Sequence, residues 1–160
     1  MPSPIRPTDD AARDLARRLM AQARFCALAV LDHDGAPLTS RIAFGQGPGG
    51  APITLISDLS THTRALLRDP RCSLLVGEPG TKGDPLTHPR LTLQGTARIV
   101  ARDTPDHDGM QRNWLEKHPK SRLYIGFADF RFARFTISSG FLNGGFGKAF
   151  DLTAQDLGLA

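Results

Sequence analysis

The chain of 160 residues has a mass of 17.3 kDa, with 40% hydrophobic and 22% charged residues. This composition is typical of a soluble globular protein and excludes a disordered chain, a collagen and a coiled coil, and the length predicts one domain covering residues 1–160. No apolar run approaches the roughly 18 residues of a membrane span. Residues 1–7 lack an apolar leader and are expected to be flexible. We therefore expect a cytoplasmic protein with no membrane partner.

The charge is basic but evenly spread. Twenty Lys and Arg residues and 16 Asp and Glu residues give a formal net charge of +4. Basic residues alternate with aspartates in segments 13–18 and 68–71, and no block of five like charges occurs. Because a nucleic-acid-binding surface concentrates its positive charge, we expect no nucleic-acid partner.

The first predicted elements are a helix and a β-hairpin. Residues 8–23 place leucines and a methionine at helical spacing behind Thr8, a favourable N-cap residue, and predict an amphipathic helix. Residues 25–31 are a short apolar strand. Asp-His-Asp-Gly at 32–35 predicts the hairpin turn, because Asp-Gly favours the tight turns that join antiparallel strands. Residues 38–44 are the returning strand.

The middle of the chain predicts three strands and a short helix. Residues 53–57 are a strand, and a helix opens at Ser60 or Thr61 and continues to Arg68. A strand follows at 72–77. Residues 78–89, rich in Pro and Gly, are a loop, and the alternation of apolar and polar residues at 90–101 predicts a long half-buried strand.

The last third predicts a helix, a strand and a short tail helix. A helix runs from Thr104 to about residue 118 and ends before Pro119, because proline disrupts a helix interior. Residues 130–142 are a strand, and a tail helix is predicted at 153–159. The hairpin and the alternating strands together predict a mainly β fold, an antiparallel barrel or sheet with peripheral helices.

Three apparent motifs carry no chemistry. Gly45–Gly50 matches the dinucleotide fingerprint in its letters, but a strand follows it instead of the helix that would hold a pyrophosphate. Asp106–Asp108 lies where a helix begins, and acidic residues suit that end of the helix dipole, so no metal site is predicted. Cys26 and Cys72 lie in apolar runs and are too few for a zinc site or a disulfide framework, which predicts buried free thiols.

One segment favours binding of a phosphate group. At residues 56–64 a strand ends in a run of hydroxyl side chains, and a helix then begins with a basic residue in its first turn. Free N–H groups, hydroxyls and cations converge at such a point, although a plain helix cap with solvated polar residues has the same sequence. Arg41 supports the phosphate interpretation if it faces the interior, and it is equally compatible with a side chain that faces solvent.

These residues resemble the pyridoxamine 5′-phosphate oxidase-like superfamily of FMN-binding split β-barrels. The resemblance rests first on TSRIAF at 39–44, SDLSTHTR at 57–64 and DPRCSLL at 69–75. Four later segments are similar to the branch that includes haem-utilisation proteins. These segments are PRLTLQGTA at 89–97, WLEKHP at 114–119, FADF at 127–130 and GGFGKA at 144–149. The resemblance covers roughly residues 10–150.

The resemblance implies a six-stranded antiparallel split β-barrel that forms a homodimer, with an FMN in each of two clefts at the interface. It implies that Arg41 contacts the FMN phosphate and that Ile42 lies under the isoalloxazine ring. The other implied cofactor contacts are Ser57, Thr61, His62 and Thr63 for the phosphate and ribityl chain, and Arg90 or Gln94 for the ring. The seven phenylalanines between 127 and 150 are predicted to form core and dimer interface.

The implied function is that of an FMN-dependent oxidoreductase. True pyridoxamine-phosphate oxidases end in a basic segment with Trp and His, whereas this chain continues as NGGFGKAF at 143–150, so we do not expect it to oxidise pyridoxamine phosphate. The resemblance implies that haem-utilisation relatives often carry a second C-terminal domain and bind the haem iron through a histidine. Here no histidine follows His118 and no residues remain for a second domain, so haem oxygenase activity is not expected either. The alternative is a non-catalytic protein that binds haem, another tetrapyrrole or flavin on the same fold.

Overall fold

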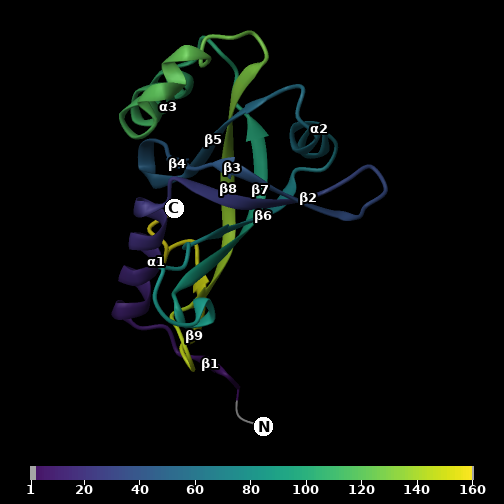
Figure 1. Ribbon diagram of the computed structural model, residues 1–160. Helices are drawn as coiled ribbons and strands as arrows, with labels where there is room; N and C mark the ends of the chain where they lie inside the picture. The colour runs from purple at the N-terminus through teal and green to yellow at the C-terminus, as the bar shows by residue number, and fades with distance from the viewer. Residues whose placement is uncertain (1–2, 160) are drawn as a thin grey trace.

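The computed structural model describes residues 3–159 and shows a mixed β and α fold built on one large, mainly antiparallel sheet. Three α-helices lie around this sheet (Figure 1): α1 spans Asp10–Gln22, α2 spans Thr61–Arg68 and α3 spans Pro105–Lys117. Each agrees with a predicted helix to within two residues at either end. Among the described helices, none is long and apolar enough to cross a membrane.

All six predicted strands are present, with ends shifted by at most two residues. They are β2 (Phe25–Leu31), β3 (Pro37–Ala43), β5 (Pro52–Ser57), β6 (Arg71–Val76), β7 (Arg90–Ile99) and β8 (Phe130–Asn143). The sheet within residues 3–159 also contains three short strands, so it is larger than the predicted six. They are β1 (Ile5–Arg6), β4 (Gly45–Gln46) and β9 (Ala149–Thr153). Short 3₁₀ turns occupy Pro48–Gly50, Pro85–Thr87 and Pro119–Leu123.

The tail helix predicted at 153–159 is wrong. Residues 149–153 form β9, which pairs antiparallel with β8 and parallel with β1, and turns follow to residue 158. Phe150 and Leu152 are 8% and 3% exposed and lie two residues apart, which is the spacing of a strand with one buried face. Of the N-terminal segment expected to be flexible, Ile5 and Arg6 pair with β9, and residues 1–2 lie outside the described residues.

The N-cap of α1 also differs from the prediction. The Asp9 carboxylate accepts a hydrogen bond from the Ala12 N–H at 2.8 Å, and it is therefore the capping group. Thr8, the predicted cap, instead donates its hydroxyl to the Asp151 carbonyl at 2.7 Å. The cap of α3 is as predicted, because the Thr104 hydroxyl accepts from the His107 N–H.

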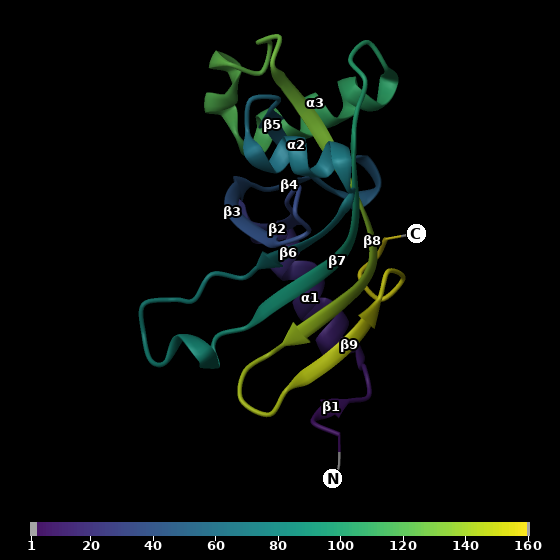
Figure 2. The ribbon, with the colours of Figure 1, turned by 90° about the vertical axis from the view of Figure 1, so that its right-hand side faces the viewer.

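The sheet curls so that β3, at one end of its strand order, approaches β5, which branches from β8. Its order is β1-β9-β8-β7-β6-β2-β3, and β5 joins through β8. β8 pairs with β5 through residues 130–134 and with β9 through residues 139–143. Figure 2 shows the long β7 and β8 crossing the molecule, with α1 behind the sheet and α2 and α3 near one end. This path brings β3, at one end of the order, next to β5.

The strands β3 and β5 lie next to each other, and we call the gap between them the seam. On this side, β5 pairs with the short strand β4. Ile53 pairs with Gly45, and Pro52 pairs with Gln46. One step further, the buried Thr54 hydroxyl donates to the Ala43 carbonyl at 2.7 Å. A side chain therefore bridges the seam just beyond the end of the backbone ladder.

A β-bulge interrupts the antiparallel pairing of β7 with β8. The register between the two strands shifts between Gln94 and Gly95. A Cβ on Gly95 would lie 1.9 Å from the Thr136 carbonyl oxygen, so only glycine allows β8 to approach this closely.

Two clusters of buried side chains fill the fold. The larger lies between α1, α2 and the inner face of the sheet, and the smaller packs α3 against β5 and β8 around the fully buried Trp114. The Trp114 indole donates to the Ser121 hydroxyl at 3.0 Å. Of the late phenylalanines, Phe132 and Phe135 are buried as core, as predicted, whereas Phe146 is 96% exposed.

The two cysteines are free, as predicted. Cys26 is buried and Cys72 is half-buried. Burial raises the pKa of both thiols to about 12, so both are protonated at neutral pH.

Candidate functional site

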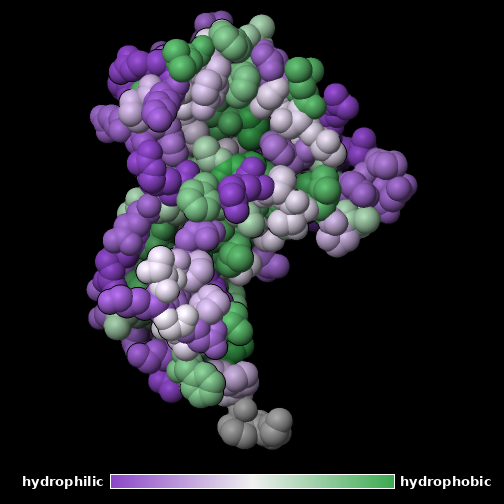
Figure 3. All heavy atoms as spheres, viewed as in Figure 1, coloured by the Kyte–Doolittle hydropathy of each residue, from purple (hydrophilic) through white to green (hydrophobic). Residues whose placement is uncertain are grey.

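The seam between β3 and β5 opens into a shallow hollow of about 220 Å³. Its lining residues come from β3, β5, the start of α2 and the first residue of β8: Arg41, Ile42, Ala43, Leu55, Ile56, Ser57, Ser60, His62 and Phe130. On the face shown in Figure 3, hydrophobic side chains gather over β3 and β5 with hydrophilic side chains around them. Four residues predicted from the sequence to bind a cofactor, Arg41, Ile42, Ser57 and His62, therefore meet at one place.

The two predicted residues on β3 face opposite ways. Ile42 is 6% exposed and its side chain belongs to the larger core cluster. Arg41 is exposed, and its guanidinium carbon lies 5.5 Å from the centre of the Phe25 ring. Arg41 therefore faces outward, which was one of the two alternatives left open by the sequence. Both residues border the hollow because β3 ends the sheet at the seam.

The hydroxyls expected to contact a phosphate are partly engaged within the protein. The Ser57 hydroxyl donates to the Asp129 carboxylate at 2.6 Å and accepts from the Leu59 N–H at 3.1 Å. Thr63 is fully buried, and its hydroxyl donates to the Ser57 carbonyl at 2.7 Å. Thr61, in contrast, is exposed at the first position of α2.

Carboxylates beside Ser57 were missed by the sequence interpretation. Asp129 bonds the Ser57 hydroxyl, and Asp58 forms an ion pair with Arg131 at 2.7 Å. No local pattern indicates these pairs, because each joins residues more than 70 positions apart through the pairing of β5 with β8. The Asp129 carboxylate places negative charge next to the predicted phosphate position, whereas the charge of Asp58 is balanced by Arg131.

His62 is held at the hollow through one ring nitrogen. Its Nδ1 lies 3.2 Å from the Ser40 hydroxyl, across from β3. Its Nε2 is buried and has no hydrogen-bond partner in the described part of the chain. Burial lowers the pKa of the imidazole below its ordinary value, so the ring is neutral at physiological pH.

The remaining predicted residues, Arg90 and Gln94, lie on β7 and do not line this hollow. The Arg90 guanidinium donates to the Leu86 carbonyl at 2.7 Å and braces the loop between β6 and β7. The Gln94 side chain is exposed, and its oxygen accepts from the Ser139 hydroxyl at 3.4 Å. Within one copy of the chain, the predicted set therefore divides into a group at the seam and a pair on β7.

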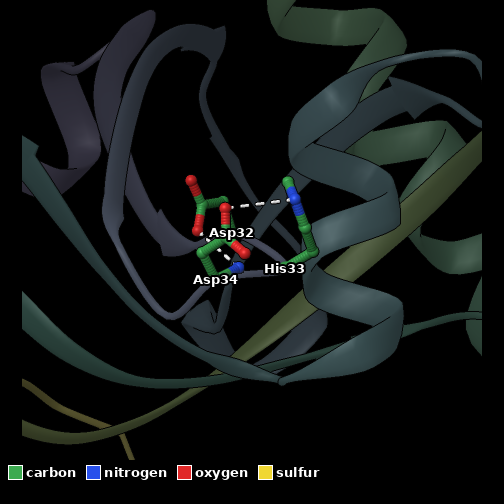
Figure 4. Close-up of side chains that lie close together, drawn as sticks. All are labelled: Asp32, His33 and Asp34. Atoms are coloured by element: carbon green, nitrogen blue, oxygen red, sulfur yellow. Dashed lines mark hydrogen bonds and ion pairs between the residues drawn. The ribbon is translucent and has the colours of Figure 1, made fainter.

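A separate acidic cluster lies at the tip of the β2–β3 hairpin. Figure 4 shows Asp32, His33 and Asp34, whose ligand-type atoms lie within 4.8 Å of one another. Asp32 caps the turn, because its carboxylate accepts from the Asp34 and Ala36 N–H groups, both at 2.9 Å. These backbone bonds lower its pKa. The cluster is thus the hairpin turn that the sequence predicted.

Comparison with known proteins places this geometry in a family. The sequence profile described as Pyridoxamine 5'-phosphate oxidase matches residues 12–143. The protein named non-canonical heme oxygenase HOZ, chloroplastic, of Arabidopsis thaliana is 36% identical over 103 residues, which cover 64% of this chain and 30% of that protein. A heme binding protein from Mycobacterium smegmatis is 29% identical, with a TM-score of 0.83 over 96% of this chain and 61% of its own. HutZ, the heme storage protein from Vibrio cholerae, is 25% identical, with a TM-score of 0.62 over 82% of this chain and 91% of its own.

The chain spans less than two thirds of the length of the plant and mycobacterial proteins. The family match nevertheless includes all the strands from β2 to β8, and with them both sides of the seam. The predicted resemblance is thereby confirmed, and the chain belongs to the pyridoxamine 5′-phosphate oxidase family.

Proposed function

We propose that this protein binds haem, or a closely similar tetrapyrrole, at the seam hollow, and that it does so as a homodimer. The names of the three relatives support the ligand, since one is a heme oxygenase, one a heme binding protein and one a heme storage protein. This is the alternative that the sequence left beside an FMN-dependent oxidoreductase.

The observation that carries the proposal is the chemical character of the hollow. Ile42, Ala43, Leu55, Ile56 and Phe130 provide apolar or aromatic lining. Haem is a flat, mostly apolar ring with two carboxylates at one edge, and an arginine beside apolar side chains suits it. Arg41 is such a residue.

The same hollow suits a phosphate group less well. A phosphate needs several hydrogen-bond donors, and the Ser57 and Thr63 hydroxyls already donate to protein oxygens. The Asp129 carboxylate, which accepts a hydrogen bond from the Ser57 hydroxyl, repels a phosphate placed at that hydroxyl. For this reason haem ranks above FMN.

The size of the hollow supports the homodimer. Pockets for small molecules and cofactors commonly enclose about 300–1,000 Å³ and bury most of the ligand. At about 220 Å³ the hollow of one copy is smaller than this. A second copy of the chain would supply the missing wall, and it would also cover some of the exposed apolar residues.

FMN remains a second candidate on one observation. The exposed Thr61 opens α2, an eight-residue helix, and Arg41 borders the hollow that this helix end also lines. A helix start together with an arginine suits an anion. Bound FMN would supply redox chemistry through its own ring, and the protein's part would be to bind and orient it.

Parallel titrations of the purified protein with hemin and with FMN test the proposal. We expect a Soret band that saturates at one hemin per chain, and weaker or no binding of FMN. Arg41→Ala should weaken hemin binding about 10–100-fold, the loss of one charge-assisted hydrogen bond. Arg18→Ala, which removes an exposed arginine on α1, is the matched control and should have no effect.

Two results would overturn the proposal. One is saturating FMN binding with no specific hemin binding, which would favour the flavoprotein. The other is hemin binding that is equally strong in the wild type, Arg41→Ala and Arg18→Ala, which would place the haem elsewhere. Sedimentation at micromolar concentration tests the dimer separately.

A further inference from the structure

One buried nitrogen at the hollow has no partner. Among the side chains of residues 3–159, His62 Nε2 is the buried nitrogen or oxygen that lacks a hydrogen-bond partner. Buried polar atoms in folded proteins are nearly always paired, so an exception calls for an explanation, and an absent ligand is one. Because His62 also lines the seam hollow, this unpartnered nitrogen belongs to a residue of the proposed haem site.

The other side of the ring has the arrangement of a metal-bound histidine. Metal-ligating histidines usually donate the N–H of their second nitrogen to a nearby acceptor, which fixes the ring orientation. The Ser40 hydroxyl lies 3.2 Å from His62 Nδ1 and can accept that N–H, which leaves the lone pair on Nε2.

The other described histidines form hydrogen bonds elsewhere in the protein or lie away from the seam hollow. His118 Nε2 lies 2.8 Å from the Phe44 carbonyl, and its ring packs on Trp114. His88 uses both nitrogens, with the Gly80 N–H on Nδ1 and the Lys82 carbonyl at Nε2. Neither His118 nor His88 lines the seam hollow.

Two histidines and both cysteines remain. His33 is exposed at the hairpin tip, and His107 packs edge-on against Phe132 with a centroid distance of 5.4 Å; neither lines the hollow. Cys26 and Cys72 are poor candidates, because burial keeps their thiols protonated whereas a metal prefers the thiolate.

We propose that His62 Nε2 would bind the haem iron, with Ser40 as the residue that positions the imidazole ring. This inference rests on the proposed function, and it gives His62 a different role from the phosphate contact that the family resemblance implies. Ser40 and Arg41 are consecutive on β3 and point to opposite faces, so the iron ligand and the cation lie on the two sides of one edge strand. Nε2 is buried, so the atoms that cover it must move aside for haem to bind.

Spectroscopy of hemin complexes tests the ligand directly. Wild type, His62→Ala and the matched control His33→Ala are loaded with hemin, and their Soret spectra and electron paramagnetic resonance spectra are compared. We expect wild type and His33→Ala to share a histidine-ligated spectrum. His62→Ala should lose it and release hemin at least 10-fold faster, and added imidazole should restore the wild-type spectrum.

Two further variants separate ligation from folding. His62→Gln keeps a side chain of similar size and should also lose the histidine-ligated spectrum, even if the alanine variant does not fold. Ser40→Ala should keep the histidine ligand but shift the resonance signals, because the Nδ1–H loses its acceptor.

The outcomes distinguish the inference from the function it rests on. If wild type and both His62 variants bind hemin with identical spectra, His62 is not the ligand, while haem binding stands. If wild type binds no hemin at all, the proposed function fails and the ligand assignment fails with it.

Discussion

Replacement of Thr54 by valine tests whether a single hydroxyl holds the seam together. Thr54 is fully buried, and its hydroxyl bridges β5 to the Ala43 carbonyl at 2.7 Å, one residue beyond the backbone pairing of Gly45 with Ile53. Valine has nearly the same shape, so the change removes the hydrogen bond and leaves little cavity. A buried acceptor that loses its donor costs about 1–3 kcal/mol. For a domain of this size, that loss lowers the melting temperature by about 2–12 °C, since each kcal/mol corresponds to about 2–4 °C.

Urea unfolding and thermal melts of Thr54→Val measure this loss, and Thr54→Ser is the matched control. Serine keeps the hydroxyl but removes a methyl group, so its cost should be near 1 kcal/mol. Because the hydroxyl lies beside the hollow, Thr54→Val should also weaken hemin binding more than Thr54→Ser does. The reasoning would be refuted by a valine variant as stable as wild type, or by a serine variant that is the less stable of the two.

Three other predictions follow from single sites. Gly95→Ala should lower the unfolding free energy by at least about 3 kcal/mol, because its Cβ would overlap a carbonyl of β8. The control is Gly126→Ala, whose Cβ would have nothing within 4 Å, and it should change the unfolding free energy by less than about 0.5 kcal/mol. The Asp156 carboxyl has its pKa lowered from 3.8 to about 2 by the Thr153 N–H and by an arginine of α1, so its contribution to stability is present above pH 3.8 and is lost as the pH falls through about 2. In urea titrations, Asp156→Asn should therefore be less stable than wild type at pH 6, and the difference should shrink as the pH falls through about 2. If the 96% exposed Phe146 packs on a second copy, Phe146→Ala should raise the dimer dissociation constant at least about 10-fold without changing the stability of the monomer, and an unchanged sedimentation profile would contradict it.

The strands and helices could be predicted because their signals are local. In β7, Leu91, Leu93 and Ala97 are buried as the alternation in the sequence indicates. The Asp-Gly turn at the hairpin tip forms as predicted, with Gly35 at a φ of +78° that glycine adopts without strain. In these segments the chain's own neighbours determine the conformation.

The tail and the site depended on distant partners. Residues 149–153 become a strand because β8 offers a free edge beside them, a fact that no local pattern contains. The predicted group of Arg41, Ser57 and His62 does meet at one hollow, but the sequence could not reveal that Asp129 already occupies the Ser57 hydroxyl. Which polar atoms remain free for a ligand is settled by tertiary contacts.

The polar atoms that remain free for a ligand bear on the choice between the two candidate cofactors. Haem and FMN are both flat rings with anionic groups, and a seam in a curled sheet can admit either of them. They differ in what they require from the protein: FMN needs several donors around a phosphate, whereas haem needs apolar contact, one cation at the edge and one ligand for the iron. At this seam the two hydroxyls of Ser57 and Thr63 donate inward, while the nitrogen of His62 is left without a partner. The free His62 nitrogen therefore favours haem, whereas the exposed Thr61 at the start of α2 and Arg41 at the hollow would suit the phosphate of FMN.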